Sequence, residues 1–166
     1  RTNLLTYSEQ FDNAAWTKNA ASITANSTTS PDGTTNADTI NLGGGTLQKF
    51  IAQSYTQNGL YTQSVYLKNG THRFVQLLTG GDVTKFVTFD LLNGISSVTG
   101  GTATIEAAAN GFYRCTFSYT TSTGSNMTII AVDSLAAGRA ASTSSTGNFY
   151  IYGAQLEQGS YSTSLI

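Results

Sequence analysis

Alternation of apolar and polar side chains is the feature that most narrows the folds open to this chain. Successive residues of a β-strand point to opposite faces, so a period of two is typical of strands with one buried face. The alternating segments are rich in β-branched and aromatic residues, which strands favour. Six segments show the pattern: Leu60–Lys68, His72–Thr79, Lys85–Leu92, Phe112–Thr120, Asn126–Asp133 and Asn148–Glu157. They predict an all-β protein.

Turn residues separate these segments. Asn58-Gly59, Asn69-Gly70, Asn93-Gly94 and Asn110-Gly111 combine residues that adopt positive φ at low cost. Strands that recur at spacings of about 8–12 residues with such turns indicate a sandwich or a barrel. We expect a single domain over residues 1–166, built as a two-sheet antiparallel jelly-roll β-sandwich with almost no helix.

Charged residues are scarce, and this limits the partners. Only 10% of the residues are charged, against roughly 25% in typical soluble domains. The net charge is -1 and the 8 Lys and Arg residues do not cluster, so the basic surface that nucleic acids require is missing. No apolar run is long enough to cross a membrane, and no signal peptide is visible. We expect neither nucleic acid nor membrane as a partner, and a start at Arg1 suggests a fragment of a longer protein.

Residue types that support catalysis are equally scarce. His72 is the sole histidine; a Ser-His-Asp triad would depend on it, yet the chain has no Gly-x-Ser-x-Gly motif. We expect His72 to be a solvated residue at a strand end. Cys115 is the sole cysteine, so no intrachain disulfide forms, and its apolar surroundings predict a buried thiol. Since no spacing singles out a pair among the nine acids, an enzyme ranks last and we expect none.

The alternation also assigns faces to the strands. One set of residues forms the expected core: Val65, Leu67, Val75, Leu77, Val87, Phe89, Leu91, Tyr113, Cys115, Phe117, Phe149 and Ile151. The opposite set mixes aromatic rings with hydrogen-bonding groups: Tyr66, Gln76, Asp90, Phe112, Arg114 and Tyr152. Sugars are bound by this combination, because rings stack on sugar C–H faces while amide, guanidinium and carboxylate groups bond the hydroxyls. We predict that these six residues bind a ligand; the alternative is that they pack under a loop or against another subunit.

Two further residues have predicted roles. Trp16 is the sole tryptophan, and near a first strand we expect it to fill the core rather than to form a binding platform. Loop carboxylates with nearby carbonyl oxygens can hold calcium in a β-sandwich without a sequence motif. Asp12 is therefore the candidate metal ligand, for a structural calcium ion.

Several short segments together resemble domains that recur in phage tail and virion structural proteins. The resemblance is carried by Asn3–Asp12 with Trp16-Thr17, Pro31–Thr35 with Ala37-Asp38, Ser64–Lys68, Phe89–Leu91 with Asn93-Gly94, Gly111–Cys115, Tyr152–Glu157 and Ser160–Ile166. Those domains are similar to the jelly-roll carbohydrate-binding modules appended to glycoside hydrolases. The resemblance implies two antiparallel sheets, a glycan site on a concave face or loop rim, and often a structural calcium. The family often has Trp where this chain has Phe112 and Tyr152.

These observations predict a non-catalytic carbohydrate-binding module. The partner would be a glycan or polysaccharide, and the parent protein would be a phage structural protein or a secreted glycan-active protein at an extracellular or virion surface. The alternative is a homo-oligomeric structural or assembly domain of a virion tail or fibre.

Overall fold

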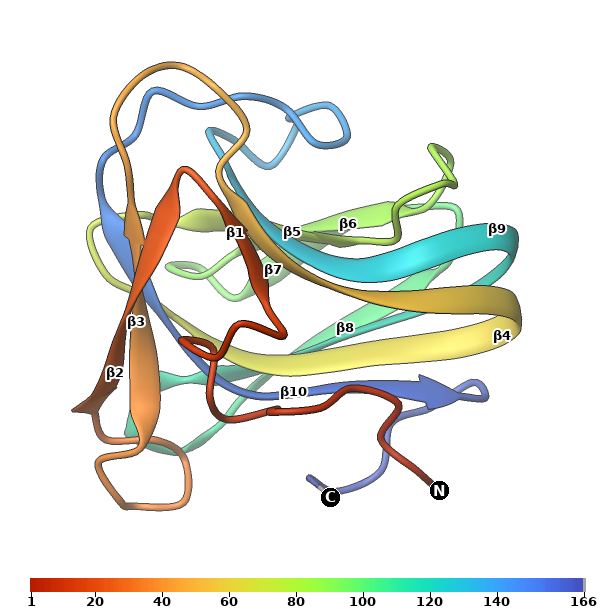
Figure 1. The fold of residues 1–166 in the computed structure, drawn as a ribbon, viewed down its shortest axis with the longest axis horizontal. Helices are drawn as coiled ribbons and strands as arrows, with labels where there is room; N and C mark the ends of the chain where they lie inside the picture. The colour runs from red at the N-terminus through yellow and green to blue at the C-terminus, as the bar shows by residue number, and fades with distance from the viewer. Residues whose placement is uncertain (166) are drawn as a thin grey trace.

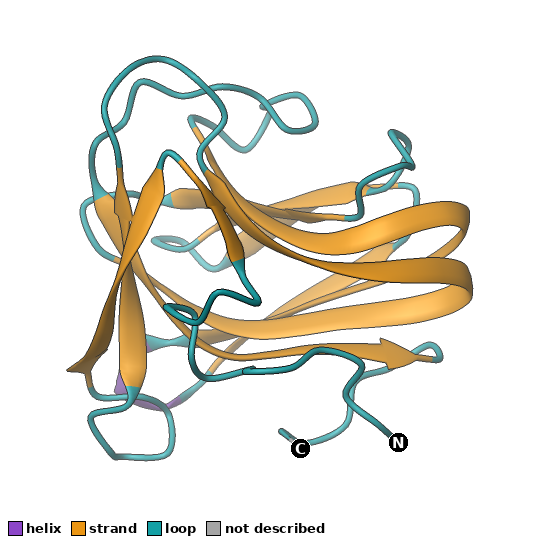
Figure 2. Cartoon of the chain, viewed as in Figure 1, coloured by secondary structure: helices purple, strands orange, loops and turns teal. Residues whose placement is uncertain are grey.

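The chain forms an antiparallel β-structure in the computed structural model, which describes residues 1–165 (Figure 1, Figure 2). The strands are β1 (Thr17–Asn19), β2 (Ala21–Thr28), β3 (Ala37–Leu42), β4 (Phe50–Asn69), β5 (Phe74–Leu78), β6 (Phe86–Asp90), β7 (Ile95–Thr99), β8 (Thr102–Ala107), β9 (Tyr113–Val132) and β10 (Asn148–Gln158). A single 3-10 turn, η1 (Ala109–Gly111), is the one helical segment in this range. No helix of residues 1–165 is long and apolar enough to span a membrane. The expected all-β class is confirmed.

All ten strands belong to one hydrogen-bonded sheet. Its order is β2-β3-β10-β4-β9-β5-β6-β7, with β1 joined to β4 and β8 joined to β9. Every pairing is antiparallel, as predicted. The sequence predicts two separate sheets, whereas the hydrogen bonding continues from one half of the structure to the other through β4 and β9.

The bend of β4 and β9 gives the sheet its folded shape. The two strands pair from Phe50↔Ile130 to Leu67↔Tyr113, with register shifts between Ser54 and Gly59. Such irregularities bend a strand and increase its twist, and both strands turn back at one end in Figure 1. The sequence predicts a turn at Asn58-Gly59 and two strands within residues 112–133; instead, β4 and β9 each run on through the bend.

The residues enclosed by the folded sheet are those that the alternation predicts. Eleven of the twelve expected core residues belong to the main buried apolar cluster, and the twelfth, Tyr113, is partly buried and packs against it. Cys115 is fully buried, and burial raises the pKa of its thiol, as expected for a structural cysteine. Trp16 is buried too: its ring centroid lies 5.1 Å from that of Phe11, and its Nε1 donates to the Tyr7 carbonyl at 3.0 Å. Its predicted place in the core is confirmed.

Buried polar side chains hold the bend together. Gln63 Nε2 donates to the Leu78 carbonyl and to the Tyr119 hydroxyl, each at 3.0 Å, and that hydroxyl donates to Gln57 Oε1. Gln57 Nε2 in turn donates to the Asn126 carbonyl at 2.9 Å. Burial raises the pKa of Tyr119, so the hydroxyl keeps its proton. These buried hydrogen bonds therefore connect the two halves of β4 to β9 on the inner side of the bend.

Tyr119→Phe tests this network. The change removes the hydroxyl and leaves Gln57 Oε1 buried without its donor, so we expect a loss of about 1–3 kcal/mol in the free energy of unfolding. Urea titration measures it. Tyr7→Phe, at a tyrosine that is 49% exposed, is the control and should change stability by less than about 0.5 kcal/mol. Equal effects of the two changes would contradict the role of the network.

Candidate binding groove

One row of side chains crosses four neighbouring strands on the face of the sheet that points away from the core. Tyr152 of β10 pairs with Tyr66 of β4, Tyr66 pairs with Arg114 of β9, and Arg114 pairs with Glu106 of β8. Residues directly opposite each other on neighbouring strands share a face. The two tyrosine ring centroids are 5.9 Å apart, and the Arg114 guanidinium lies 5.7 Å from the Tyr66 ring centroid. The structure thus brings three of the six predicted ligand-binding residues onto one face of the sheet: Tyr66, Arg114 and Tyr152. We call this outward face of β10, β4, β9 and β8 the wall.

The C-terminal segment, residues 159–165, lies over this row. Thr163 donates to the carboxylate of Glu157, through its backbone N–H at 3.0 Å and its hydroxyl at 2.7 Å. Arg114 Nη2 donates to the Thr163 carbonyl. Leu165 packs against the apolar cluster that contains Tyr152. The segment therefore decides which part of the wall a ligand can reach.

The aromatic end of the row is closed to solvent. Tyr152 is 5% exposed, and its hydroxyl donates to Asp32 Oδ2 at 3.0 Å. Burial, together with the carboxylates of Glu9 and Asp32, raises the pKa of Tyr152. Phe112 is 1% exposed in the same cluster. The expectation that Tyr152 and Phe112 face water is wrong, because each ring completes a small apolar cluster instead.

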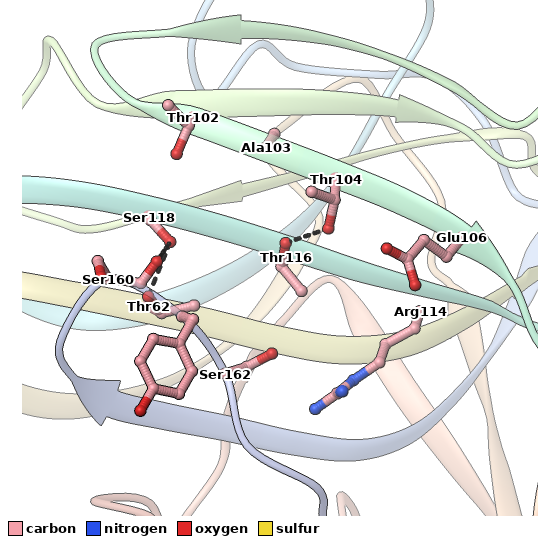
Figure 3. A pocket seen from close by; sticks show the side chains of 11 residues that line it. Thr62, Thr102, Ala103, Thr104, Glu106, Arg114, Thr116, Ser118, Ser160 and Ser162 are labelled. Atoms are coloured by element: carbon pink, nitrogen blue, oxygen red, sulfur yellow. Dashed lines mark hydrogen bonds between the residues drawn. The ribbon is translucent and has the colours of Figure 1, made fainter.

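The accessible part of the wall is a groove next to this row (Figure 3). It occupies about 260 Å³ between β8 and β9 on one side and the C-terminal segment on the other. Most of its lining carries aliphatic hydroxyls: Thr62, Thr102, Thr104, Thr116, Ser118, Ser160 and Ser162. We call this site, together with Ala103, Glu106, Arg114 and Tyr161, the hydroxyl groove.

The hydroxyls are arranged by strand register. Thr104 and Thr116 are opposite each other and hydrogen-bonded, as are Thr62 and Ser118 at 2.7 Å. Ser118 also donates to the Ser160 carbonyl at 3.1 Å, which fixes the C-terminal segment against β9. A hydroxyl has one proton but two lone pairs, so these pairs retain acceptor capacity toward the groove.

Three further groups supply charge and an aromatic surface. The Glu106 side chain is exposed and makes no hydrogen bond or ion pair with the described residues. Arg114 Nε is buried without a hydrogen-bond partner among them. Tyr161 is 62% exposed, with the Arg1 guanidinium 3.9 Å from its ring centroid. The groove therefore offers a free carboxylate, a partly exposed guanidinium and an accessible ring.

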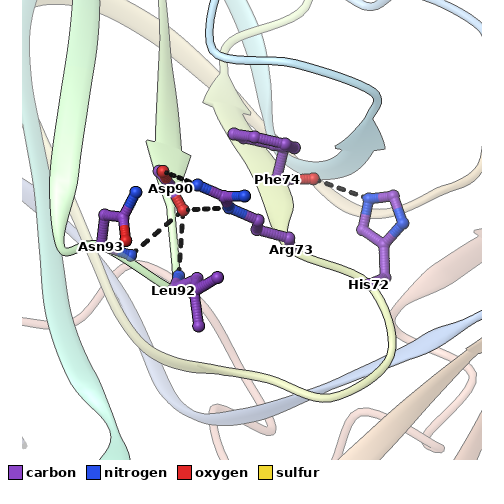
Figure 4. A network of polar contacts seen from close by, with 6 residues as sticks. All are labelled: His72, Arg73, Phe74, Asp90, Leu92 and Asn93. Carbon is purple, nitrogen blue, oxygen red and sulfur yellow. Dashed lines mark hydrogen bonds and ion pairs between the residues drawn. The ribbon is translucent and has the colours of Figure 1, made fainter.

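Gln76 and Asp90 do not belong to this wall. Both lie on strands paired with the other half of the sheet, and both are buried. Gln76 binds the backbone of the loop over residues 137–140 through Nε2 and Oε1. Asp90 accepts two hydrogen bonds from Arg73, at 2.7 and 2.8 Å, and others from the N–H groups of Leu92 and Asn93 (Figure 4). Since Arg73 lowers the pKa of Asp90 to about 2, this carboxylate is a charged anchor for a turn, not part of the predicted face.

Most of the groove is not among the residues predicted from the sequence. Glu106 and the hydroxyls of Thr102 and Thr104 come from β8, which is not among the six predicted strand segments. The signal was present, because residues 102–107 alternate Thr, Ala, Thr, Ile, Glu, Ala. Tyr161 gives no such signal, since only the path of the C-terminal segment places it there.

The candidate metal ligand Asp12 lies in an acidic hollow with Glu9 and Asp38. Both Asp38 oxygens already accept backbone hydrogen bonds, from Phe11 at 3.1 Å and from Asn26 at 2.9 Å. In the part of the chain that the structure describes, no three His, Cys, Asp or Glu residues are grouped so that they would hold an ion. A calcium site at Asp12 stays a prediction.

Comparison with known proteins adds no assignment. No protein-family model matches the sequence, and no curated protein matches it.

His72 is not the solvated residue that the sequence predicts. It is 6% exposed, and its Nδ1 lies 2.8 Å from Ser145 Oγ. Its Nε2 lies 2.8 Å from the Phe74 carbonyl oxygen, a contact drawn in Figure 4. Ser145 Oγ also accepts from the Gly147 N–H at 3.2 Å. These contacts use both ring nitrogens and link the loop before β10 to the start of β5. Burial lowers the pKa of His72.

The buried His72 predicts that the protein is less stable in mild acid. The unfolded chain binds a proton near pH 6.5 and the folded chain only at lower pH, so stability is intact above about pH 6.5 and falls below it, by up to about 1.4 kcal/mol per pH unit. We expect the urea midpoint to decrease between pH 7.5 and pH 5.5, and His72→Asn to flatten that slope. Burial raises the pKa of Asp38, and this shift increases stability as the pH falls. The effect is the same in the unaltered protein and in the His72→Asn variant, so it cancels when their slopes are compared. Parallel slopes would contradict the assignment.

Proposed function

We propose that this protein is a non-catalytic carbohydrate-binding module of jelly-roll type, and that the hydroxyl groove binds a glycan. One observation carries the proposal: a shallow groove lined by hydroxyls has a free carboxylate, Glu106, beside a partly unpaired guanidinium, Arg114, with the exposed ring of Tyr161 at its rim. The module would belong to a phage structural protein or a secreted glycan-active protein at an extracellular or virion surface.

The chemistry of the groove matches that of a sugar. A carboxylate accepts hydrogen bonds from sugar hydroxyls, and a guanidinium donates to hydroxyl or ring oxygens. Serine and threonine hydroxyls do both. The ring of Tyr161 offers a surface for sugar C–H groups. Few apolar side chains line the groove, which disfavours apolar ligands.

A non-catalytic role is also part of the proposal. Among the described residues that line the groove, Glu106 is the only carboxylate, whereas glycoside hydrolysis commonly requires two facing carboxylates about 5–10 Å apart. Turnover of a polysaccharide that is lost on Glu106→Gln would contradict this part.

Variants of the groove test the proposed function. A glycan array identifies ligands, and titration calorimetry measures their affinity. We expect Tyr161→Ala to weaken binding by about 1–3 kcal/mol, on the scale of aromatic stacking, and Glu106→Gln to weaken it roughly tenfold through loss of charged hydrogen bonds. Tyr7→Ala, at a tyrosine outside the groove, is the matched control and should bind as the unaltered protein does. No glycan bound at millimolar concentration would refute the proposal.

A specific observation supports a second candidate, an assembly domain. Leu92, Ile95 and Val98 are 56%, 48% and 40% exposed, and the last two lie on β7, at one end of the strand order. An exposed apolar edge strand is a site where another chain can add. If this is the function, the protein sediments as an oligomer, Ile95→Lys converts it to a monomer, and no glycan binds. A monomeric particle mass at high concentration would exclude it.

A further inference from the structure

We infer that the ligand is a linear, uncharged polysaccharide of several units, which extends beyond the hydroxyl groove into a second hollow at the bend of β4 and β9. This inference rests on the proposed function and adds the length, direction and charge class of the ligand. The groove alone, at about 260 Å³, is below the roughly 300–1,000 Å³ of sites for drug-sized molecules. A longer ligand must leave it at one end.

The direction is set by β9. Its side chains at Arg114, Thr116 and Ser118 line the groove, and the next residue on the same face is Thr120, which is exposed. The register is continuous there, from Ser118↔Thr62 to Thr120↔Leu60, so Thr120 shares the face of Ser118. Thr120 lines a second hollow of about 390 Å³ with Asp82, Thr84, Lys85 and Ser122 among its other residues.

Two glycines, Gly100 and Gly101, lie in a turn that is packed closely against its neighbours. A Cβ atom on Gly101 would lie 2.3 Å from the Ser118 carbonyl oxygen, and one on Gly100 would lie 2.0 Å from the Thr84 carbonyl oxygen. The turn between β7 and β8 therefore packs against the backbone of β9 and of the loop that carries Thr84 and Lys85. It links the strand that lines the groove to the loop that lines the second hollow.

The path along β9 from Arg114 to Thr120, which we call the track, is too long to be filled by a single sugar. The six residue steps from Arg114 to Thr120 span about 20 Å of strand, which is longer than one sugar ring. Hydroxyls recur along this path, from Thr116 and Ser118 to Thr120 and Ser122. A polysaccharide repeats its hydroxyl groups along its length. Each of its units can therefore form the same kind of hydrogen bond with the hydroxyls that recur along β9.

The charges favour an uncharged chain. The groove has Arg114 and Glu106, and the second hollow has Lys85 and Asp82, so each end carries one cation and one anion. Hydrogen bonds from Thr84 and Thr121 hold the pKa of Asp82 below its usual value, which keeps it ionised. A polyanion would meet a carboxylate at both ends.

An oligosaccharide series tests the inference. Cello-oligosaccharides and N-acetylglucosamine oligosaccharides of one to six units are titrated into the whole protein, with oligogalacturonides of the same lengths as the anionic comparison. We expect one neutral series to bind with affinity that rises at least about tenfold from dimer to hexamer. Thr120→Trp, which places a large ring on the face of β9 that a longer ligand would follow, should abolish the gain for the hexamer and leave dimer binding unchanged.

Two further variants complete the design. Lys85→Ala should weaken hexamer binding roughly three- to tenfold, as loss of a hydrogen bond does, without changing dimer binding. Thr17→Trp, at an exposed threonine of β1, is the matched control for the added ring, and circular dichroism verifies that each variant folds.

The outcomes separate the two proposals. Monomers or dimers that bind as tightly as hexamers, with Glu106→Gln still weakening them, would overturn the extended track and leave the groove as a sugar site. Hexamer affinity that survives Thr120→Trp, or a preference for the oligogalacturonides, would also overturn the inference. Absence of binding by every glycan on the array would remove the proposed function and the track with it.

Discussion

The pairing of β4 with β9 is the interaction on which the rest of the structure depends. Each strand has 20 residues, far above the usual strand length of about 5–6, and together they carry the hydrogen bonding around the bend. One half of the pair supports β10 and β8, and the other half supports β1 and β5. Where the two strands bend, polar groups are left inside the fold and must be hydrogen-bonded. Gln57, Gln63 and Tyr119 bond one another there, so the bend depends on this polar network as well as on the apolar core.

The same pairing sets the candidate site. Register places Arg114 of β9 beside Tyr66 on one side and Glu106 on the other, and two residues further it places Thr116 beside Thr104. Alternation along a single strand predicts which residues share a face, and for Tyr66, Arg114 and Tyr152 this was sufficient. It does not predict which strands are neighbours. Gln76 and Asp90 have the right chemistry and alternation, yet they lie on strands beyond the bend, where a loop and Arg73 satisfy them.

What alternation cannot predict is which parts of a face are covered. Tyr152 has the period of a surface residue, but it is 5% exposed because the C-terminal segment and the loop of Asp32 lie over it. Both are irregular segments held by side-chain contacts, such as those of Thr163 with Glu157, and such contacts leave no periodic trace in a sequence. Exposure explains why alternation did not indicate three of the strands. β2, β7 and β8 are short or largely exposed, so few apolar residues mark their inner faces.

The scarcity of charge has a physical meaning once the groove is considered. Arg73 and Asp90 form the single ion pair found in the described range, and hydroxyls and amides make most other side-chain contacts. Ionised groups are costly to strip of water, whereas a hydroxyl gives up its water at much lower cost when another hydroxyl replaces it. A surface lined by hydroxyls can therefore exchange water for a polyhydroxylated chain with little net penalty, and affinity then depends on a few stronger contacts. In this protein Glu106 makes no hydrogen bond or ion pair in the described range, and Tyr161 is 62% exposed. These two groups and the partly exposed guanidinium of Arg114 can supply such contacts in the groove.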